Sequence, residues 1–176
     1  MSSRWGMKAV LAIGIALAGS LAAHAQQDHA TPQEVVYRVR QAAKDIAELG
    51  EEGLATYRGR NVTSVWKDSY VTVLSCEGWT ALTATHPIQP EFQGRPVAQT
   101  LTAGPKPGEQ ITAEFCAAGR KPHGGWVAYN FHKPGGTRPE RKVSYFLAAP
   151  GTPYVVSAGI YDPRAKIEEL ARFSGG

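Results

Sequence analysis

Apolar residues recur every three or four positions in the first part of the chain after residue 30. These positions, with small residues among them, are Val35, Val39, Ala42, Ile46, Leu49, Gly53 and Tyr57. Their spacing predicts one buried stripe on a long helix over residues 32–57. Thr31 and Glu34 have the spacing of a capping box at its start. Because glycine is costly inside a helix, Gly50 and Gly53 predict either close packing against a neighbouring segment or a break near Gly50.

After residue 61 the pattern changes to the β-branched and aromatic residues that are typical of strands. Residues 64–74 predict one strand, which a turn at Glu77-Gly78 joins to a second strand over residues 81–85. The last third of the chain predicts three more strands, over residues 125–132, 142–147 and 154–161. The Pro- and Gly-containing turns between these three are too short for parallel crossovers, so the sheet is predicted to be antiparallel with about five strands.

Residues 86–125, between the two groups of strands, are punctuated by Pro and Gly and contain one short predicted helix over residues 109–118. A last amphipathic turn or two is predicted over residues 163–173. Together these elements predict an α+β domain in which the N-terminal helix packs along one face of the antiparallel sheet. The irregular stretch alone would cover the other face, so a ligand cavity is expected there.

The first 25 residues follow a pattern of their own. A basic start, an apolar run over residues 9–19 and a small-residue site over residues 23–25 follow one another. This order predicts a secretory signal peptide that is cleaved before Gln26. The alternative is a membrane anchor, which needs about 20 apolar residues, and this run is shorter. The mature protein over residues 26–176 would then be one periplasmic or secreted domain in an oxidising compartment.

Composition narrows the classes of function. The chain holds 19 Lys and Arg against 15 Asp and Glu, a formal net charge of +4. Because no stripe of basic residues is present, nucleic acid is not the expected partner. Two cysteines, Cys76 and Cys116, are too few for a cysteine-rich miniprotein or a four-cysteine zinc site. In an exported protein, a structural disulfide between them is favoured over a reactive thiol activated by His86.

The sequence shows none of the short motifs that mark common catalytic or cofactor sites. Its serines are scattered, and neither a nucleophile elbow nor a glycine-rich phosphate loop is found. His86, His123 and His132 lack the spacing of a chelating motif. The sequence therefore predicts no enzyme activity, no metal and no cofactor.

Several motifs, taken in order along residues 33–162, resemble the single Cache domain, an extracytoplasmic sensor module with a PAS-like fold. They are Val65-Trp66-Lys67-Asp68-Ser69-Tyr70, Thr85-His86-Pro87, Gly124-Gly125-Trp126-Val127-Ala128-Tyr129, Lys142-Val143-Ser144-Tyr145, Pro150-Gly151-Thr152-Pro153-Tyr154 and Ala158-Gly159-Ile160-Tyr161. The resemblance implies a PAS-like, Cache-type fold for the whole mature chain. It also implies a small organic acid as ligand, of the acetate, propionate or pyruvate type.

Seven aromatic or polar residues of these motifs form the candidate ligand-binding set: Trp66, Tyr70, His86, Trp126, Tyr129, Lys142 and Tyr145. The ammonium group of Lys142 could bind a carboxylate beside tyrosine hydroxyls, or Lys142 could be a solvated residue at a strand edge. His86 could hydrogen-bond a carboxylate, or it could cap the end of a strand. Side chains alternate between the faces of a regular strand. Alternation separates Lys142 from Tyr145 and Trp126 from Tyr129, and it keeps Trp66 and Tyr70 on one face.

Residues and resemblance together predict a periplasmic domain that binds or senses a short-chain carboxylate, without a transmembrane or signalling part of its own. Any signal would pass to a membrane sensor or to another periplasmic protein. The alternative is a structural or protein-interaction domain whose cavity is filled by side chains and holds no ligand. Its docking surface would be the sheet edge or the long helix, and the long helix is also a candidate surface for a homodimer.

Overall fold

The computed structural model describes residues 29–78 and 80–175. The predicted signal peptide and its cleavage site before Gln26 lie outside these residues. Within the described ranges, no helix is both long and apolar enough to span a bilayer.

The first helix begins where the capping box predicts. Helix α2 spans Pro32–Leu49, and Thr31 caps it. The Glu34 backbone N–H donates to Thr31 Oγ1 at 3.2 Å, and the Thr31 backbone N–H donates to Glu34 Oε2 at 2.8 Å. The helix turns its apolar stripe to the sheet and buries Val35, Val36, Val39, Ala42, Ala43 and Ile46.

The predicted helix divides at its first glycine. Gly50 ends α2 with φ 57°, a left-handed conformation in which glycine carries no steric penalty. A short helix, α3, follows over Glu51–Ala55. A Cβ atom at Gly53 would collide with the backbone carbonyl of Asp45, so α3 packs tightly against α2 at that position. The break near Gly50 and the close packing are thus both present.

Five antiparallel strands form the main sheet in the order β4-β3-β7-β6-β5. They are β3 (Thr72–Ser75), β4 (Leu82–Thr85), β5 (Gly125–His132), β6 (Pro139–Ala148) and β7 (Tyr154–Tyr161). Strands β5, β6 and β7 form the predicted meander, and the β3–β4 hairpin pairs with β7 through β3. The predicted α+β fold with about five antiparallel strands is confirmed.

The prediction of one continuous strand over residues 64–74 is wrong. Strands β1 (Val65–Trp66) and β2 (Ser69–Tyr70) instead form a separate two-stranded hairpin, and only then does β3 begin. Lys67, in the turn between them, has φ 47°. Glycine and asparagine usually occupy such a position, so Lys67 did not mark this turn, and Asp68 beside it was the only turn-type residue there.

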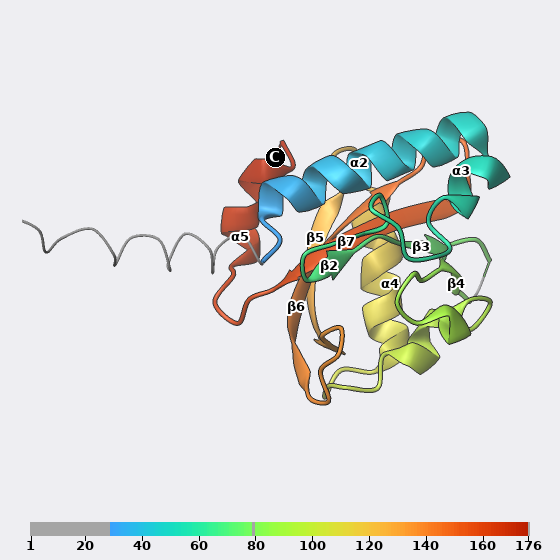
Figure 1. The fold of residues 1–176 in the computed structure, drawn as a ribbon. Coiled ribbons are helices and arrows are strands. Elements are labelled where there is room, and N and C mark those ends of the chain that lie inside the picture. Colours follow the sequence, from blue (N-terminus) through green and yellow to red (C-terminus); the bar gives the residue numbers. More distant parts are fainter. Residues whose placement is uncertain (1–28, 79, 176) are drawn as a thin grey trace, which may run out of the picture.

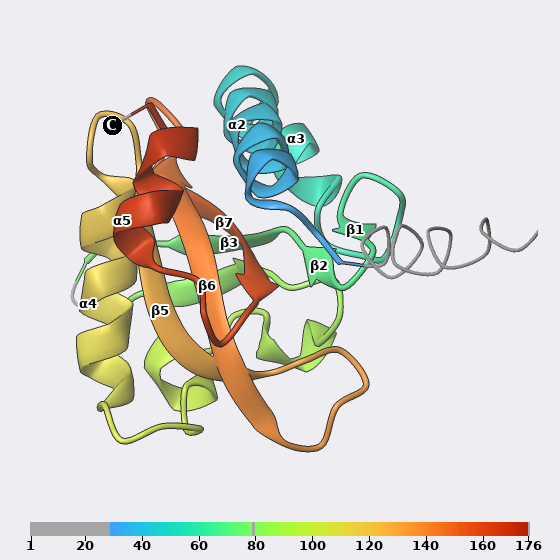
Figure 2. The ribbon, with the colours of Figure 1, turned by 90° about the vertical axis from the view of Figure 1, so that its left-hand side faces the viewer.

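Different layers cover the two faces of the sheet (Figures 1 and 2). Helix α2 lies along one face, above an apolar cluster that it shares with the strands. The opposite face is covered by α4 (Gly108–Gly119) and by the irregular segment with η1 (Pro90–Phe92) and η2 (Val97–Thr100), over a second apolar cluster. The C-terminal turns α5 (Ile167–Leu170) and η3 (Ala171–Phe173) lie near the start of α2. The second face is therefore covered as predicted.

Candidate functional site

A small cavity lies on the α4 side of the sheet, the face on which a ligand cavity was expected. Its volume is about 40 Å³, and four of the seven predicted ligand-binding residues line it: Tyr70, His86, Tyr129 and Lys142. Much of the remaining wall is apolar and consists of Leu74, Val97, Leu101, Phe115, Phe131 and Phe146. Pockets for drug-sized ligands measure about 300–1,000 Å³, so this cavity fits a ligand of only a few non-hydrogen atoms.

Regular alternation along β5 and β6 decides which side chains reach the cavity. Lys142 faces the cavity from β6, and Tyr145 faces α2. On β5, Tyr129 faces the cavity, while Trp126 lies on the α2 side. The predicted separation within each pair is confirmed, because β5 and β6 pair without a register shift over their whole contact.

The other three predicted ligand-binding residues, Trp66, Trp126 and Tyr145, do not line the cavity. They lie in the apolar cluster beneath α2. The Tyr145 hydroxyl donates to the carbonyl oxygen of His123 at 2.7 Å, so its polar group is already paired. The prediction that Trp66 and Tyr70 share a face is wrong, because the chain reverses between them at the β1–β2 turn and the alternation of a single strand does not apply.

Lys142 is the one Asp, Glu, Lys or Arg side chain among the described residues that line the cavity. Only 3% of its surface is exposed. Its Nζ lies 4.0 Å from the ring centre of Tyr70 and 5.1 Å from that of Tyr161. Within residues 29–78 and 80–175, Nζ has neither a hydrogen-bond acceptor nor an ion-pair partner. Burial lowers the pKa of Lys142 to about 7, against a smaller opposing effect of the Asp68 carboxylate.

His86 also lines the cavity and is 5% exposed. Its Nδ1 accepts a hydrogen bond from the Gln89 backbone N–H at 2.9 Å. The imidazole packs 5.1 Å from the ring of Tyr70. Burial and then the charge of Lys142 lower the pKa of His86 to about 3, so the ring is neutral near neutral pH.

Two tyrosines, Tyr70 and Tyr129, belong to the lining. Burial raises the pKa of Tyr129 to about 12, and the Tyr129 hydroxyl lies 3.1 Å from Ser144 Oγ. Burial, helped by Tyr161 and Tyr129, also raises the pKa of Tyr70. Both phenols are therefore protonated near neutral pH and able to donate hydrogen bonds. The lining thus combines one cationic side chain with two neutral phenols, of which Tyr70 is already hydrogen-bonded to Tyr161.

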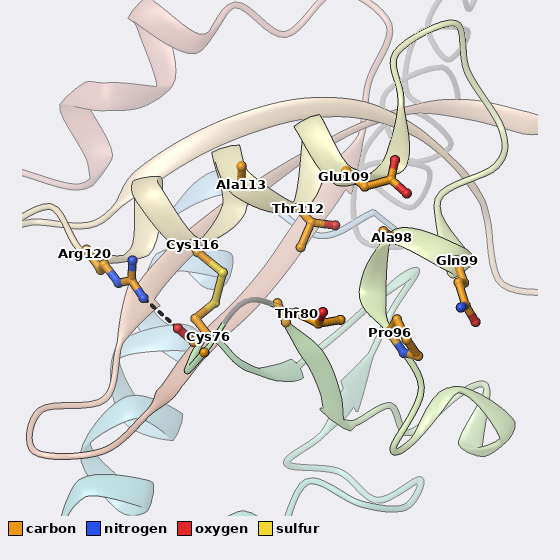
Figure 3. A pocket seen from close by; sticks show the side chains of 12 residues that line it. Cys76, Thr80, Pro96, Ala98, Gln99, Glu109, Thr112, Ala113, Cys116 and Arg120 are labelled. Atoms are coloured by element: carbon orange, nitrogen blue, oxygen red, sulfur yellow. Dashed lines mark hydrogen bonds between the residues drawn. A yellow bond between two sulfur atoms is a disulfide. The ribbon is translucent and has the colours of Figure 1, made fainter.

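A disulfide joins Cys76 and Cys116 (Figure 3), so the predicted pairing is present. The bridge joins the segment after β3 to α4, and Phe115, next to Cys116, lines the cavity. Arg120 Nη2 donates to the Cys76 carbonyl oxygen at 2.6 Å. An outer groove of about 460 Å³ lies beside the bridge, and none of the seven candidate ligand-binding residues lines it.

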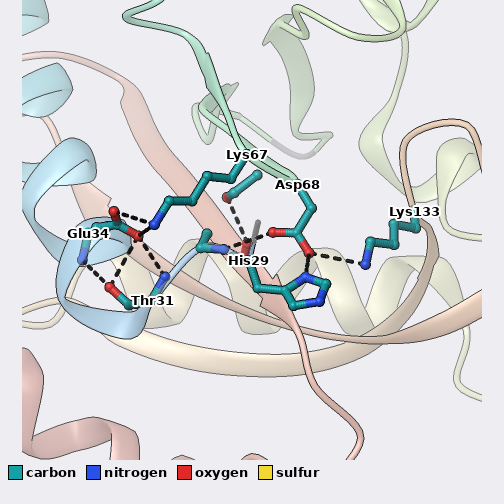
Figure 4. Close-up of polar contacts among 9 residues, drawn as sticks. His29, Thr31, Glu34, Lys67, Asp68 and Lys133 are labelled. Carbon is teal, nitrogen blue, oxygen red and sulfur yellow. Dashed lines mark hydrogen bonds and ion pairs between the residues drawn. The ribbon is translucent and has the colours of Figure 1, made fainter. Parts of the chain in front are cut away.

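Near the cavity, Asp68 holds three segments together (Figure 4). Its carboxylate accepts a hydrogen bond from the Ala30 backbone N–H at 2.8 Å and lies 2.7 Å from His29 Nδ1 and 3.1 Å from Lys133 Nζ. Burial opposes ionisation, but the Ala30, His29 and Lys133 contacts outweigh it and lower the pKa of Asp68. An ionised Asp68 thereby ties the segment before α2 to the β1–β2 turn and to the β5–β6 hairpin. Among the described residues, no three His, Cys, Asp or Glu side chains are grouped as metal ligands.

Several lining residues escaped the sequence analysis. Phe131 lies two positions after Tyr129, and Phe146 lies four after Lys142, so strand alternation was a signal that could have found both. Phe115 on α4 had no such signal, because its side chain reaches the cavity through the packing of α4 on the sheet.

Comparison with known proteins gives one family and a set of similar folds. The family model described as single Cache domain 2 matches residues 2–168. Among curated proteins, none matches the sequence of this chain.

Three solved structures share the fold. The crystal structure of a methyl-accepting chemotaxis protein from Vibrio parahaemolyticus RIMD 2210633 has a TM-score of 0.57 and 16% identity over 86% of this chain and 95% of that one. A periplasmic sensor domain of a chemotaxis protein has a TM-score of 0.53 and 22% identity, over 82% and 99%. A structure described as the basis for carboxylic acid recognition by a Cache chemosensory domain has a TM-score of 0.54 and 16% identity, over 82% of this chain and 99% of that one.

Proposed function

This chain belongs to the single Cache domain 2 family of periplasmic ligand-sensing domains, and from that premise we propose that its cavity binds a short-chain monocarboxylate. The observation that carries the proposal is the buried ammonium of Lys142, which lacks an acceptor and a counter-ion among the described residues. An unpaired buried charge is costly. A ligand carboxylate would supply the missing partner through a charge-assisted hydrogen bond.

The size and lining of the cavity support a small monocarboxylate of the acetate, propionate or pyruvate type. A volume of about 40 Å³ admits few non-hydrogen atoms. The apolar wall, with Phe115 and Phe146 stacked at 4.3 Å between ring centres, would contact a short alkyl group. No Asp or Glu is among the described residues of the lining, so the α-ammonium of an amino acid would face Lys142 without a counter-ion. The fold is shared with a Cache chemosensory domain described as recognising a carboxylic acid, and this similarity supports the same ligand class.

We propose that the domain acts in the periplasm or as a secreted protein, after cleavage before Gln26, and that a membrane sensor or another periplasmic protein reads its liganded state. The family, the order of basic, apolar and small residues in the first 25 positions and the Cys76–Cys116 disulfide support this location. Intact-mass analysis of exported protein is expected to give Gln26 as the first residue and no free thiol. An uncleaved N-terminus or two free thiols would contradict the proposal.

Thermal unfolding of dialysed protein tests the ligand class. Acetate, propionate and pyruvate are the probes, with alanine and propionamide as matched controls of similar size. A probe at 100 times its dissociation constant should stabilise the protein by about 2.7 kcal/mol. Unchanged melting curves with every carboxylate would favour the alternative, a structural or protein-interaction domain without a ligand.

A further inference from the structure

A groove lies outside the cavity, between the two layers that cover the sheet. This α2–α4 groove has a volume of about 490 Å³ and is lined by α2, the end of α4 and the end of β6. Its apolar floor includes Ala43 and Ala47 on α2 and Leu147 on β6. The volume is within the range of ligand-binding pockets, and the small alanines keep the groove open.

Positive charge borders the α2–α4 groove. Among the described residues, four cations and one carboxylate line it: Arg40, Lys44, Arg120 and Lys121, with Glu48. Lys44 and Glu48 form an ion pair of 2.6 Å and neutralise each other. Three cations therefore remain in one groove of a chain whose formal net charge is +4.

Another groove shows that this concentration of charge is not general. It lies beside the start of α2 and the C-terminal turns, and its volume is about 780 Å³. Its described lining holds three carboxylates and three Lys or Arg side chains: Asp68, Asp162, Glu169, Arg164, Lys166 and Arg172. Because the two signs are balanced there, that groove favours no partner of one charge.

Backbone carbonyl groups hold two of the cations in the α2–α4 groove. Arg40 Nη2 donates to the Ser174 carbonyl oxygen at 3.0 Å, and Arg120 Nη2 donates to that of Cys76 at 2.6 Å (Figure 3). Within residues 29–78 and 80–175, neither Arg120 nor Lys121 has a carboxylate partner. The helix dipole favours cations at the end of α4, but it does not account for Arg40 on α2.

The same two elements line this groove and the cavity. Strand β6 carries Lys142 in the cavity and Leu147 in the groove, and α4 carries Phe115 in the cavity and Gly119 in the groove. A Cβ atom at Gly119 would lie 2.4 Å from Val155 Cγ1, so the end of α4 packs closely on β7. A partner in the groove would therefore contact the elements that a ligand touches from inside.

We propose that the α2–α4 groove docks an acidic, amphipathic segment of another protein, the one that reads the state of the cavity. Carboxylates of the segment pair with Arg120 and Lys121, and a short apolar side chain lies against Ala43 and Ala47. The concave shape favours a protein segment over a membrane, because a flat bilayer surface does not enter a groove. Docking is independent of carboxylate binding, and only the reading of the liganded state rests on the proposed function.

A synthetic peptide tests the docking. The probe is a capped peptide with Glu and Leu at helical spacing, and the same peptide with Gln in place of Glu is its control. Calorimetric titration at about 0.15 M salt measures both. We expect the Gln peptide to bind roughly 10-fold more weakly than the Glu peptide, the effect of losing two exposed ion pairs. Equal binding of the two peptides, or no binding of the Glu peptide, would overturn the inference.

Three variants locate the binding, with thermal unfolding as the folding control for each. Lys121→Glu should weaken the Glu peptide by roughly fivefold or more. Arg138→Glu changes the net charge equally in the exposed turn between β5 and β6 and should bind like wild type. Ala47→Phe fills the floor without a change of charge and should weaken binding by about tenfold or more. Equal effects of the two charge reversals, or wild-type binding by a folded Ala47→Phe, would contradict docking in the groove.

Two further measurements use the wild-type protein. If Ala47→Phe does not fold, amide chemical shifts decide: the Glu peptide should shift residues 119–122 and 147–150, and shifts confined to other regions would refute the site. Binding to phosphatidylglycerol vesicles that Lys121→Glu abolishes, without binding of the Glu peptide, would assign the groove to a membrane and overturn the proposal.

Saturating propionate separates docking from reading. We expect propionate to change the affinity for the Glu peptide by roughly fivefold or more, the lower end of common coupling between two sites. An unchanged affinity with propionate bound in the cavity would refute the reading role. If no carboxylate probe binds but the Glu peptide still docks, the proposed function fails and the docking surface stands.

Discussion

The two faces of the sheet are built from the same strands but differ in packing: one is filled by apolar side chains, and the other lines a cavity. Under α2, Val143 and Tyr145 are fully buried against the apolar stripe of an 18-residue helix. Under α4, a 12-residue helix and an irregular segment leave a cavity, and Lys142 lies in it next to Val143 in sequence. A long amphipathic helix supplies enough apolar surface to fill its face. The shorter cover does not, and it leaves the cavity in which we propose that a ligand binds.

The Cys76–Cys116 disulfide links α4, on the cavity face, to the segment after β3. Replacing Cys76 and Cys116 by Ser is expected to lower the free energy of unfolding by up to about 4 kcal/mol, because the denatured chain regains the entropy of a long closed loop. Urea denaturation measures this loss. Reductant should cause a similar loss in the wild type and no further loss in the double Ser variant. Unchanged stability on reduction would mean that packing alone holds α4.

Packing should dominate on the α2 face. Ile46 is fully buried in α2, and Ile46→Ala is expected to lower the free energy of unfolding by roughly 3 kcal/mol through lost burial and the cavity that remains. Leu49→Ala is the control on the same helix, because Leu49 is 56% exposed and should change stability by less than about 0.5 kcal/mol. Calorimetric titration of Ile46→Ala with propionate should give the wild-type affinity. A tenfold change in affinity would show that the two faces are coupled.

How far the sequence predicted the molecule also differs between regions. The capped helix α2 and the meander β5–β7 were predicted because each has a regular period and clear end signals. That regularity also made the placement of Lys142 and Tyr129 predictable. The hairpin β1–β2 was missed because Lys67 takes a left-handed conformation without the usual turn residue. The error put Trp66 on the wrong face.

Lining residues outside β5 and β6 could not be predicted in the same way, because their place depends on packing between segments far apart in sequence. Phe115 comes from α4, and Thr72 comes from a strand whose start was misplaced. Thr72 Oγ1 lies 2.8 Å from Ser157 Oγ across the β3–β7 pairing, a neighbour that no local pattern identifies. A sequence period assigns residues to a face, but not to a cavity on that face.

Substitutions at Lys142 and Tyr145, on opposite faces of β6, test whether only the cavity face binds a ligand. Lys142→Met keeps the volume and removes the charge, so it should abolish the stabilisation of about 2.7 kcal/mol that a carboxylate gives at 100 times its dissociation constant. Tyr145→Phe is the matched control from the α2 face. It loses the bond to His123, so its free energy of unfolding should fall by about 1 kcal/mol, and its ligand-induced shift should be unchanged. Thermal unfolding with propionate measures both, and a full shift in Lys142→Met would remove Lys142 from the site.

The last effect, and the one that tests the role of the cavity face most directly, is that of pH on Lys142. Its pKa is about 7 in the folded protein, against 10.5 as the ordinary value. Between these values the unfolded chain binds more protons than the folded one, so the stability of the ligand-free protein should rise with pH across that window, relative to Lys142→Met. Carboxylate binding should change in the opposite direction, because it needs the ammonium form.

Affinity for propionate is therefore expected to be nearly constant from about pH 6 to pH 7 and to fall by up to tenfold, about 1.4 kcal/mol, per pH unit above that. The other titratable groups near Lys142 do not produce this trend, since Tyr70, Tyr129 and Tyr161 have raised pKa values, while His86 stays neutral and Asp68 ionised. Calorimetry near pH 8 in two buffers of different ionisation enthalpy should detect proton uptake on binding. Affinity that stays constant up to about pH 9 would mean that Lys142 remains charged without a ligand, held by the face of the Tyr70 ring.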